Sequence, residues 1–323
     1  MFDPEEFTAR ARAHWTKERV TKVTAGRDYP IDPAEGALLL RALGLLNADA
    51  SMSADAVKKF GQINHLVTML EPSILELTKQ IARPSILDAG CGSSYLTFLL
   101  AWCFARRWSH PADIFGIDSN PRLIEKCRER ARLAGLEGLR FEAIALEAVN
   151  WSDLAARHLP APPESARETS RRPHAVFALH ACDTATDQAI ALGIKERADL
   201  IAVAPCCQAE LARAWARLAA EHRTGAFAPL WHSPQLRRES AATVTDMMRV
   251  LLLRGAGYEV TAQEFVPSSH TPKNTLIRAV RRGSYWLDAL KEYRALRAAT
   301  GDESIVLESL LPAEHRARLD GLA

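Results

Sequence analysis

The stretch SILDAGCGSS, residues 85–94, decides the fold of this chain. An apolar run of strand length ends at Asp88, and a helical pattern begins at Tyr95. Gly90 and Gly92 permit a tight strand-to-helix turn and a close approach of the backbone to a ligand. The stretch therefore predicts the first strand and the ligand-binding turn of an α/β sheet.

Further short apolar runs follow, and plausible helices separate them. These runs are DIFGID (113–118), LRFEAI (139–144), HAVFALH (174–180), ADLIAVAP (198–205), YEVTAQEFV (258–266) and NTLIRAVRR (274–282). The alternation predicts a parallel sheet with crossover helices, and the last two runs predict an antiparallel hairpin that completes it. The fold class is therefore α/β, with a Rossmann-like seven-stranded sheet.

An N-terminal helical region, residues 1–83, precedes the sheet and shows no strand pattern. Asp32-Pro33 is a suitable cap and first-turn pair, and Ser53 opens a second amphipathic run that Pro72 should interrupt. We expect this region to be followed by the sheet domain, residues 84–283, and by a C-terminal helical tail, residues 284–323.

The composition is that of an ordinary globular protein, with 48% hydrophobic and 25% charged residues. The formal charge of +2 neither demands nor excludes a polyanionic partner. The longest apolar runs reach about ten residues, half of a bilayer span, so we expect no membrane segment. The charged N-terminus and the irregular spacing of six cysteines favour a reduced, cytoplasmic protein.

The second predicted strand ends in Asp118, whose carboxylate can accept hydrogen bonds from both ribose hydroxyls of a nucleoside. A dinucleotide site would also need a glycine three residues after Gly92 to seat a pyrophosphate, and Tyr95 occupies that position. The pattern thus favours a nucleoside ligand over NAD, and it disfavours a dehydrogenase. The alternative is a glycine turn that serves packing alone.

Together, the turn and this acid resemble the class I S-adenosylmethionine-dependent methyltransferases, whose first motif reads D/E-x-G-x-G. The resemblance covers roughly residues 84–282, and it implies S-adenosylmethionine as the cofactor. The implied cofactor-binding residues are Asp88, Gly90, Cys91, Gly92, Asp118, Leu146 and His180. The family often places an acid after the third strand, whereas this chain has Ala145, so adenine should rest on apolar neighbours and a backbone group near Leu146.

Three strings resemble a narrower subfamily that includes the eukaryotic acceptor-stem tRNA 2'-O-methyltransferase. They are HACDTATD (180–187), PCCQ (205–208) and KKFGQINH (58–65), and the zinc-finger pattern of that tRNA enzyme does not occur here. The first two strings follow predicted strands, where open α/β sheets form ligand sites. This resemblance implies an RNA acceptor such as a tRNA ribose 2'-hydroxyl.

Methyl transfer to a hydroxyl requires alignment of the acceptor and removal of its proton. The catalytic candidates are Asp183, Lys59 and His180, because an ammonium favours the alkoxide and a carboxylate can hold that ammonium or accept the proton. Alternatively, Asp183 is an N-cap of the helix that begins at Thr184, and Lys59 is an exposed helical lysine. The candidate substrate-binding residues are Gln62, Cys206, Gln208 and Lys273.

Soft metal ligands also occur after the fourth and fifth strands. They are His180, Cys182, Cys206 and Cys207. Adjacent cysteines project in different directions and no CxxC pair is present, so we expect no metal.

The evidence for the acceptor is less specific. Basic clusters at 19–30, 106–108 and 281–282 fit phosphate contacts, but solvated helix ends and loops explain each cluster as well. The segment 223–238, which contains Trp231, is a candidate substrate-facing element. A protein side-chain methyltransferase and a non-catalytic cofactor-binding module remain as alternatives to an RNA methyltransferase.

Overall fold

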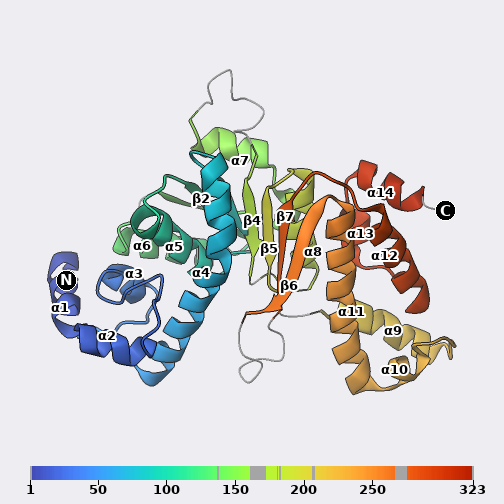
Figure 1. The fold of residues 1–323 in the computed structure, drawn as a ribbon, viewed down its shortest axis with the longest axis horizontal. Coiled ribbons are helices and arrows are strands. Elements are labelled where there is room, and N and C mark those ends of the chain that lie inside the picture. The colour runs from blue at the N-terminus through green and yellow to red at the C-terminus, as the bar shows by residue number, and fades with distance from the viewer. Residues whose placement is uncertain are drawn as a thin grey trace. The chain divides into compact units, whose positions relative to one another are not determined.

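Short strands rich in aliphatic residues form the sheet of the computed structural model (Figure 1). The structure describes all residues except 1, 137, 161–171, 180, 182, 206–207, 266–274 and 322–323. The strands within the described residues are β1 (Ser85–Ala89), β2 (Asp113–Asp118), β3 (Leu139–Ala143), β4 (Ala175–Ala178), β5 (Leu200–Val203), β6 (Tyr258–Glu264) and β7 (Thr275–Arg281). Their order is β3-β2-β1-β4-β5-β7-β6, which confirms the predicted seven-stranded Rossmann-like fold.

The chain divides into two compact units. The first unit comprises Met1–Val149 and Asp153–Ala161, and the second comprises Asn150–Ser152 and Pro162–Ala323. No helix within the described residues has both the length and the apolar character that a bilayer crossing requires.

The first unit contains the three parallel strands β1, β2 and β3, with β2 between the other two. Every residue of β1 is buried, as expected for a parallel strand that is covered on both faces. The helices of this unit are α1 (Pro4–His14), α2 (Lys17–Thr24), α3 (Ala37–Ala42), α4 (Ala54–Gln80), α5 (Tyr95–Trp102), α6 (Pro121–Leu133) and most of α7 (Trp151–His158). A π-helical turn, Cys103–Arg107, extends α5, and a short 3-10 turn, Leu146–Ala148, follows β3.

The N-terminal region is helical as predicted, with two differences in its boundaries. Ser53 caps α4 by accepting a hydrogen bond from the amide of Ala56 at 3.2 Å. Pro72 does not interrupt this helix, because a continuous buried face carries α4 on to Gln80 despite the missing amide donor. Asp32 caps only a preceding turn, and α3 begins later, at Ala37.

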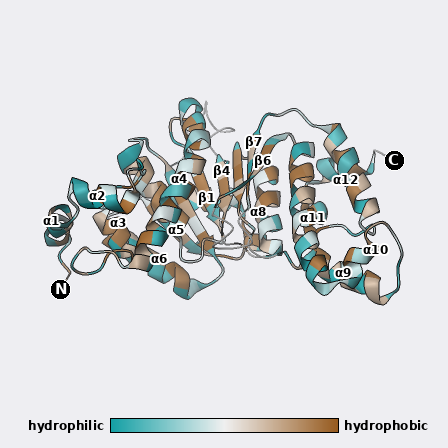
Figure 2. Ribbon diagram, turned by 60° about the horizontal axis from the view of Figure 1, so that its bottom comes forward, coloured by the Kyte–Doolittle hydropathy of each residue, from teal (hydrophilic) through white to brown (hydrophobic). Residues whose placement is uncertain are grey.

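The second unit contains β4 and β5 in parallel, and β7 lies antiparallel between β5 and β6. The predicted terminal hairpin is therefore confirmed. The helices of this unit are α8 (Thr184–Lys195), α9 (Glu210–Ala220), α10 (Ala228–His232), α11 (Pro234–Gly255), α12 (Leu287–Ala299), α13 (Val306–Leu310) and α14 (Ala313–Asp320). In Figure 2 the strands of this unit are largely hydrophobic, and α11 packs against α9, α12 and β6.

The segment 223–238, predicted as a substrate-facing element, is largely helical, and its Arg237 and Arg238 line a cavity of the second unit. It forms α10 and the first turn of α11, so helix α11 starts several residues earlier than the sequence pattern suggests. Trp231 is only 2% exposed and packs in the core of the second unit, near Gly225 and Gly301. Its apolar ring therefore stabilises this unit from within, and the substrate-facing role of the segment stays a prediction.

Candidate functional site

The glycine turn after β1 adopts the backbone that its sequence predicts. Gly90 and Gly92 have φ angles of +71° and +53°, values that favour glycine because a Cβ atom causes strain there. The amide of Cys91 donates to the carbonyl of Ile117 at 2.8 Å, and the amide of Gly92 donates to the Asp118 carboxylate at 2.9 Å. The turn and the acid at the end of β2 therefore meet at one edge of the sheet.

Asp118 has the capacity to bind a ribose. Its two carboxylate oxygens accept hydrogen bonds from the amides of Gly92 and Asn120, at 2.9 and 2.8 Å, and the residue remains partly exposed. A carboxylate offers about four lone-pair positions, so two stay available for hydroxyl donors. A Cβ atom placed on Gly92 would meet nothing within 4 Å, so the space beside the turn is open. These residues fit the nucleoside part of S-adenosylmethionine.

Asp88 is buried at the base of the turn, where it accepts a hydrogen bond from Thr97 Oγ1 of α5 at 2.5 Å. Burial raises the pKa of Asp88 to about 6, against the opposing effect of the Thr97 hydrogen bond. A cation nearby would favour the ionised form. Asp88 therefore joins β1 to α5 and can respond to the ammonium group of a bound cofactor.

Cys91 contributes to the turn through its backbone. The side chain is 1% exposed, and burial raises the pKa of the thiol far above its usual range. Its sulfur would lie 3.2 Å from a Cβ atom on Gly116, and Phe141 would lie still closer. Gly116 thus makes room for this packing, a role that the sequence analysis missed because the close neighbours come from other elements.

The segment after β3 lies beside the end of β2, because the amide of Ile144 donates to the carbonyl of Asp118 at 2.9 Å. Ala145 precedes the 3-10 turn that begins at Leu146, and both residues are partly exposed. This apolar edge suits the predicted adenine contact.

Lys59 of α4 lies near the start of α5, directly after the glycine turn. Its Nζ atom is 3.7 Å from the centroid of the Tyr95 ring, and the Tyr95 hydroxyl donates to the carbonyl of Leu43 at 3.0 Å. The lysine is exposed, and Gln62 on the same helix is partly exposed. In the sequence, Tyr95 argued only against a dinucleotide, and no local pattern indicates this contact between its ring and the ammonium group of Lys59.

In the second unit, Asp183 follows β4 with a φ angle of +52°. Its carboxylate accepts hydrogen bonds from the amide of Ala209 at 3.2 Å and from Arg213 at 2.9 Å. Burial opposes ionisation, but the bonds from Arg213 and Ala209 outweigh it, so the pKa of Asp183 is lowered. Asp183 occupies the N-cap position of α8, as the alternative expected, but its side chain makes no capping hydrogen bond to that helix. The carboxylate instead holds the start of α9.

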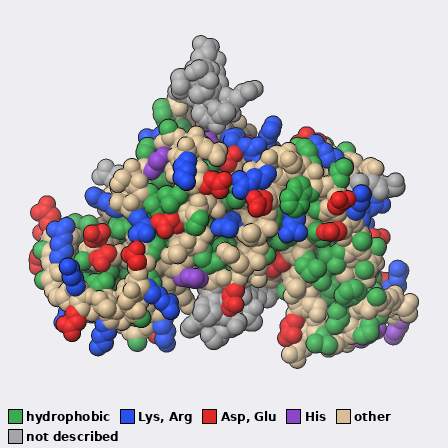
Figure 3. Space-filling model, viewed as in Figure 1, with side chains coloured by type: hydrophobic (Ala, Val, Ile, Leu, Met, Phe, Trp, Pro, Cys, Tyr) green, Lys and Arg blue, Asp and Glu red, His purple; other side chains and the backbone are tan. Residues whose placement is uncertain are grey.

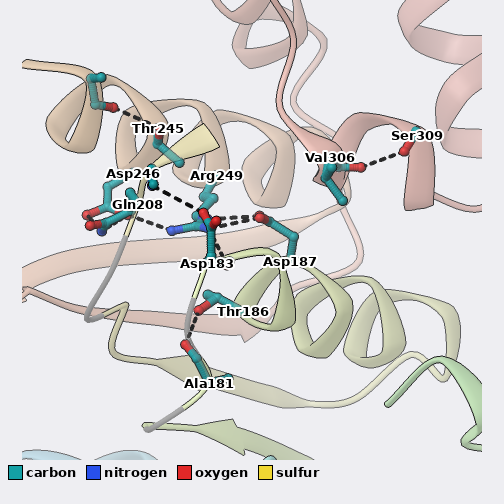
Figure 4. Close-up of polar contacts among 12 residues, drawn as sticks. Ala181, Asp183, Thr186, Asp187, Gln208, Thr245, Asp246, Arg249, Val306 and Ser309 are labelled. Carbon is teal, nitrogen blue, oxygen red and sulfur yellow. Dashed lines mark hydrogen bonds and ion pairs between the residues drawn. The ribbon is translucent and has the colours of Figure 1, made fainter. Parts of the chain in front are cut away.

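Gln208, after β5, belongs to a buried polar cluster that includes Asp246 and Arg249 of α11 (Figure 4). His180, Cys206 and Lys273 lie outside the described residues, as do Cys182 and Cys207 of the soft-ligand set. Among the residues that are described, no group of three or more His, Cys, Asp or Glu could hold a metal ion.

A cavity of about 1380 Å³ opens beside this cluster. Gln208 and Asp246 line it, and the alanines of α9 and α11 leave room between these two helices. Figure 3 shows hydrophobic side chains gathered over the region of α9 to α11. The volume exceeds the usual range of about 300–1,000 Å³ for small-ligand pockets, so a larger molecule can fit.

Comparisons with known proteins found one family model and several solved structures that resemble this chain. Residues 58–214 match the model of a family described as a methyltransferase domain. The chain is similar to magnesium protoporphyrin IX methyltransferase from Synechocystis PCC 6803, at 14% identity and a TM-score of 0.40, over 76% of this chain and 93% of that one. It is also similar to an rRNA methylase from Streptococcus thermophilus, at 12% identity and a TM-score of 0.37, over 66% of this chain and 95% of that one. No curated protein matches the chain.

The strand order, the glycine turn and the acid at the end of β2 are those expected for a nucleoside-binding α/β fold. The family match covers the turn, β1 to β5 and the start of α9. Residues 58–214 therefore match a methyltransferase domain, and within them the glycine turn and Asp118 have the geometry of a nucleoside site.

Proposed function

We propose that this enzyme transfers the methyl group of S-adenosylmethionine to RNA, with a tRNA ribose 2'-hydroxyl as the favoured acceptor. The observation that carries the proposal is the position of Lys59, whose ammonium lies 3.7 Å from the Tyr95 ring, next to the glycine turn. The resemblance of the strings at 58–65, 180–187 and 205–208 to the tRNA-modifying subfamily supports it. The proposal includes a cytoplasmic location.

The cofactor supplies an activated methyl group on a sulfonium, so the protein must align the acceptor and manage its proton. A ribose hydroxyl is a weak acid, and a nearby ammonium stabilises the alkoxide that attacks the methyl group. The Lys59 ammonium contacts an aromatic ring, and in the described part of the chain no carboxylate pairs with it. Its charge is therefore available to an acceptor oxygen.

The other candidates complete this proposal. The pKa of Asp183 is lowered, so its carboxylate stays ionised near neutral pH. It is therefore better suited to orient the acceptor than to retain the proton that the acceptor loses. His180 remains a catalytic candidate. The candidate contacts to the acceptor are Gln62, Cys206, Gln208 and Lys273.

A labelling experiment tests the acceptor. Wild-type enzyme is incubated with methyl-labelled S-adenosylmethionine and a cell extract, and the labelled fraction is digested with nuclease or with protease. We expect nuclease-sensitive label, and alkali-resistant labelled dinucleotides will identify the 2'-O position. Label that only protease releases would establish the protein side-chain alternative.

Lys59→Met then tests the role of the ammonium, with Lys58→Met as the matched control. Lys58 is the preceding residue on the same helix and is also exposed, and it pairs with Asp55 at 3.5 Å. Lys59→Met should lower the transfer rate about 100-fold, within the usual range for acid-base groups, with little change in cofactor affinity. Equal rates for both variants would remove Lys59 from the mechanism.

A further inference from the structure

We propose that Arg249 of α11 is a positioning residue that holds the turns after β4 and β5 in one arrangement and thereby sets the acceptor side of methyl transfer. The part of this inference that concerns RNA rests on the proposed function. The part that concerns the two turns rests on contacts within the second unit alone.

The Arg249 guanidinium contacts groups from three elements (Figure 4). Nε and Nη2 donate to the two carboxylate oxygens of Asp187 on α8, each at 2.8 Å. Nη2 also donates to the backbone carbonyl of Asp183 at 3.2 Å, and Nη1 donates to Asp246 at 3.1 Å. One planar side chain thus holds the turn after β4, the first turns of α8 and its own helix together.

Asp246 extends this network to the turn after β5. Both of its carboxylate oxygens accept hydrogen bonds from the Gln208 side-chain nitrogen, at 3.0 and 2.9 Å. The Asp183 carboxylate makes a second link, because it binds Arg213 and the amide of Ala209 at the start of α9. The two strand-end turns are therefore joined both directly and through Arg249.

The burial of this network indicates that it orients the groups it contacts more than it adds stability. The side chains of Arg249 and Asp187 are 1% and 0% exposed. Withdrawing such charges from water carries a large desolvation cost, and apolar residues of similar volume often give equal or greater stability. A packed apolar contact, however, has no donors with which to orient a carbonyl or a carboxylate.

The backbone at Asp183 shows what the network restrains. Asp183 combines a φ angle of +52° with a ψ angle of −119°, an unfavourable conformation for a residue with a side chain. Arg249 holds its carbonyl, Arg213 and Ala209 hold its carboxylate, and Thr186 closes the turn by donating to Ala181 at 2.7 Å. Strained residues persist where their surroundings over-determine them, and they concentrate at functional sites.

The turns that Arg249 restrains lie where an acceptor is expected to bind. Ligand sites of open α/β sheets form at the carboxyl ends of parallel strands, where both turns lie. Gln208 and Asp246 also line the 1380 Å³ cavity. Because misplacement by about 1 Å can cost about 100-fold in rate, a change at Arg249 should act on transfer without touching the glycine turn of the first unit.

The test separates positioning from stability by replacing the whole buried pair. Arg249→Met alone leaves Asp187 buried without a partner and should melt early. The double variant R249M/D187L removes both charges and should recover a melting temperature close to that of wild type. The matched control, R297M/E308L, replaces the ion pair between α12 and α13, whose Nη1 to carboxylate distance is 2.9 Å.

Two readouts are compared with wild type at a temperature where every variant is folded. One is the total label transferred to a cell extract, and the other is hydrogen exchange of peptides that span residues 183–188 and 208–213. We expect R249M/D187L to lose about 100-fold in transfer and to exchange faster in both peptides, with cofactor affinity unchanged. The control variant should match wild type in both readouts.

Wild-type transfer and wild-type exchange in R249M/D187L would overturn the proposal, because Arg249 would then contribute stability alone. If that variant does not fold, Arg249→Lys decides the question. A lysine keeps the charge but cannot contact Asp187 and the Asp183 carbonyl in the same planar geometry. Full activity of Arg249→Lys would equally refute positioning. Label on protein, or no label with any extract, would count against the proposed function, while the exchange comparison still judges Arg249.

Discussion

Removal of the Asp118 carboxylate provides the sharpest test of the cofactor site. Asp118→Ala deletes two hydrogen bonds from backbone amides, those of Gly92 at 2.9 Å and Asn120 at 2.8 Å. Bonds to a charged group contribute about 1.5–3 kcal/mol each, and partial exposure places both at the low end, for a sum of about 3 kcal/mol. For a cooperative unit of this size, that loss lowers the melting temperature by about 6–12 °C.

If Asp118 holds the ribose, the same substitution leaves the ribose hydroxyls of the cofactor without their charged acceptor. That loss adds about 1–3 kcal/mol to the binding free energy, which corresponds to a Kd about 5- to 150-fold higher. Asp118→Asn keeps one acceptor oxygen, so its loss of stability should be about half as large. Titration calorimetry with S-adenosylmethionine and with its demethylated product measures the affinity, and thermal melts measure the stability.

Asp113→Asn is the matched control, because Asp113 is the first residue of β2 and Asp118 is the last. Its carboxylate accepts hydrogen bonds from Arg83 at 2.7 and 2.9 Å, at the opposite end of the strand. This control should lower the melting temperature and leave the cofactor Kd unchanged. Wild-type affinity in Asp118→Ala, or an equal loss of affinity in Asp113→Asn, would refute the assignment of Asp118 to the ribose.

Three further predictions concern other parts of the molecule. Burial raises the pKa of Asp88 to about 6, so its buried charge weakens the fold above that pH and the penalty is relieved as the pH falls toward the usual value of 3.8. Cofactor affinity should fall from about pH 7 to about pH 5 as Asp88 is protonated. Asp88→Asn cannot ionise, so the same dependence of calorimetric affinity on pH in wild type and in Asp88→Asn would contradict this prediction. Gly116→Ala should cost about 1–3 kcal/mol in urea unfolding, because its Cβ would lie 2.6 Å from Phe141, whereas Gly138→Ala meets nothing within 4 Å and should be neutral. Asp183→Asn should lower the transfer rate about 100-fold. Normal turnover together with early melting would instead show that the Asp183 carboxylate only stabilises the start of α9.

Much of the fold could be read from local pattern. The strands were predictable because a buried parallel strand needs a short continuous apolar run, and residues 85–89 and 113–118 provide such runs. Ser53 was predictable as a cap because serine hydroxyls accept hydrogen bonds from amides in the first turn of a helix, and the amide of Ala56 makes this bond. Pro72 was misjudged, since the buried face of a long helix outweighed the loss of one backbone hydrogen bond.

The candidate site also contains residues that local pattern predicts and residues that only distant contacts place. The glycine turn and Asp118 were found because a positive φ angle requires glycine and because the acid ends a recognisable strand. The partners of Asp183 were not found, since Ala209 lies 26 residues away and Arg213 lies 30 residues away. No local pattern indicates which distant helix start will lie beside a strand-end turn.

The sequence by itself determined the strands and the glycine turn, because each depends on the backbone preferences and spacing of residues that are near neighbours in the chain. Only the tertiary structure decided that Lys59 meets the Tyr95 ring, that Trp231 is buried, and that Arg249 joins Asp187 across 62 residues. Such contacts follow from the packing of whole elements against one another, and that packing is set by the total buried surface and not by any single motif.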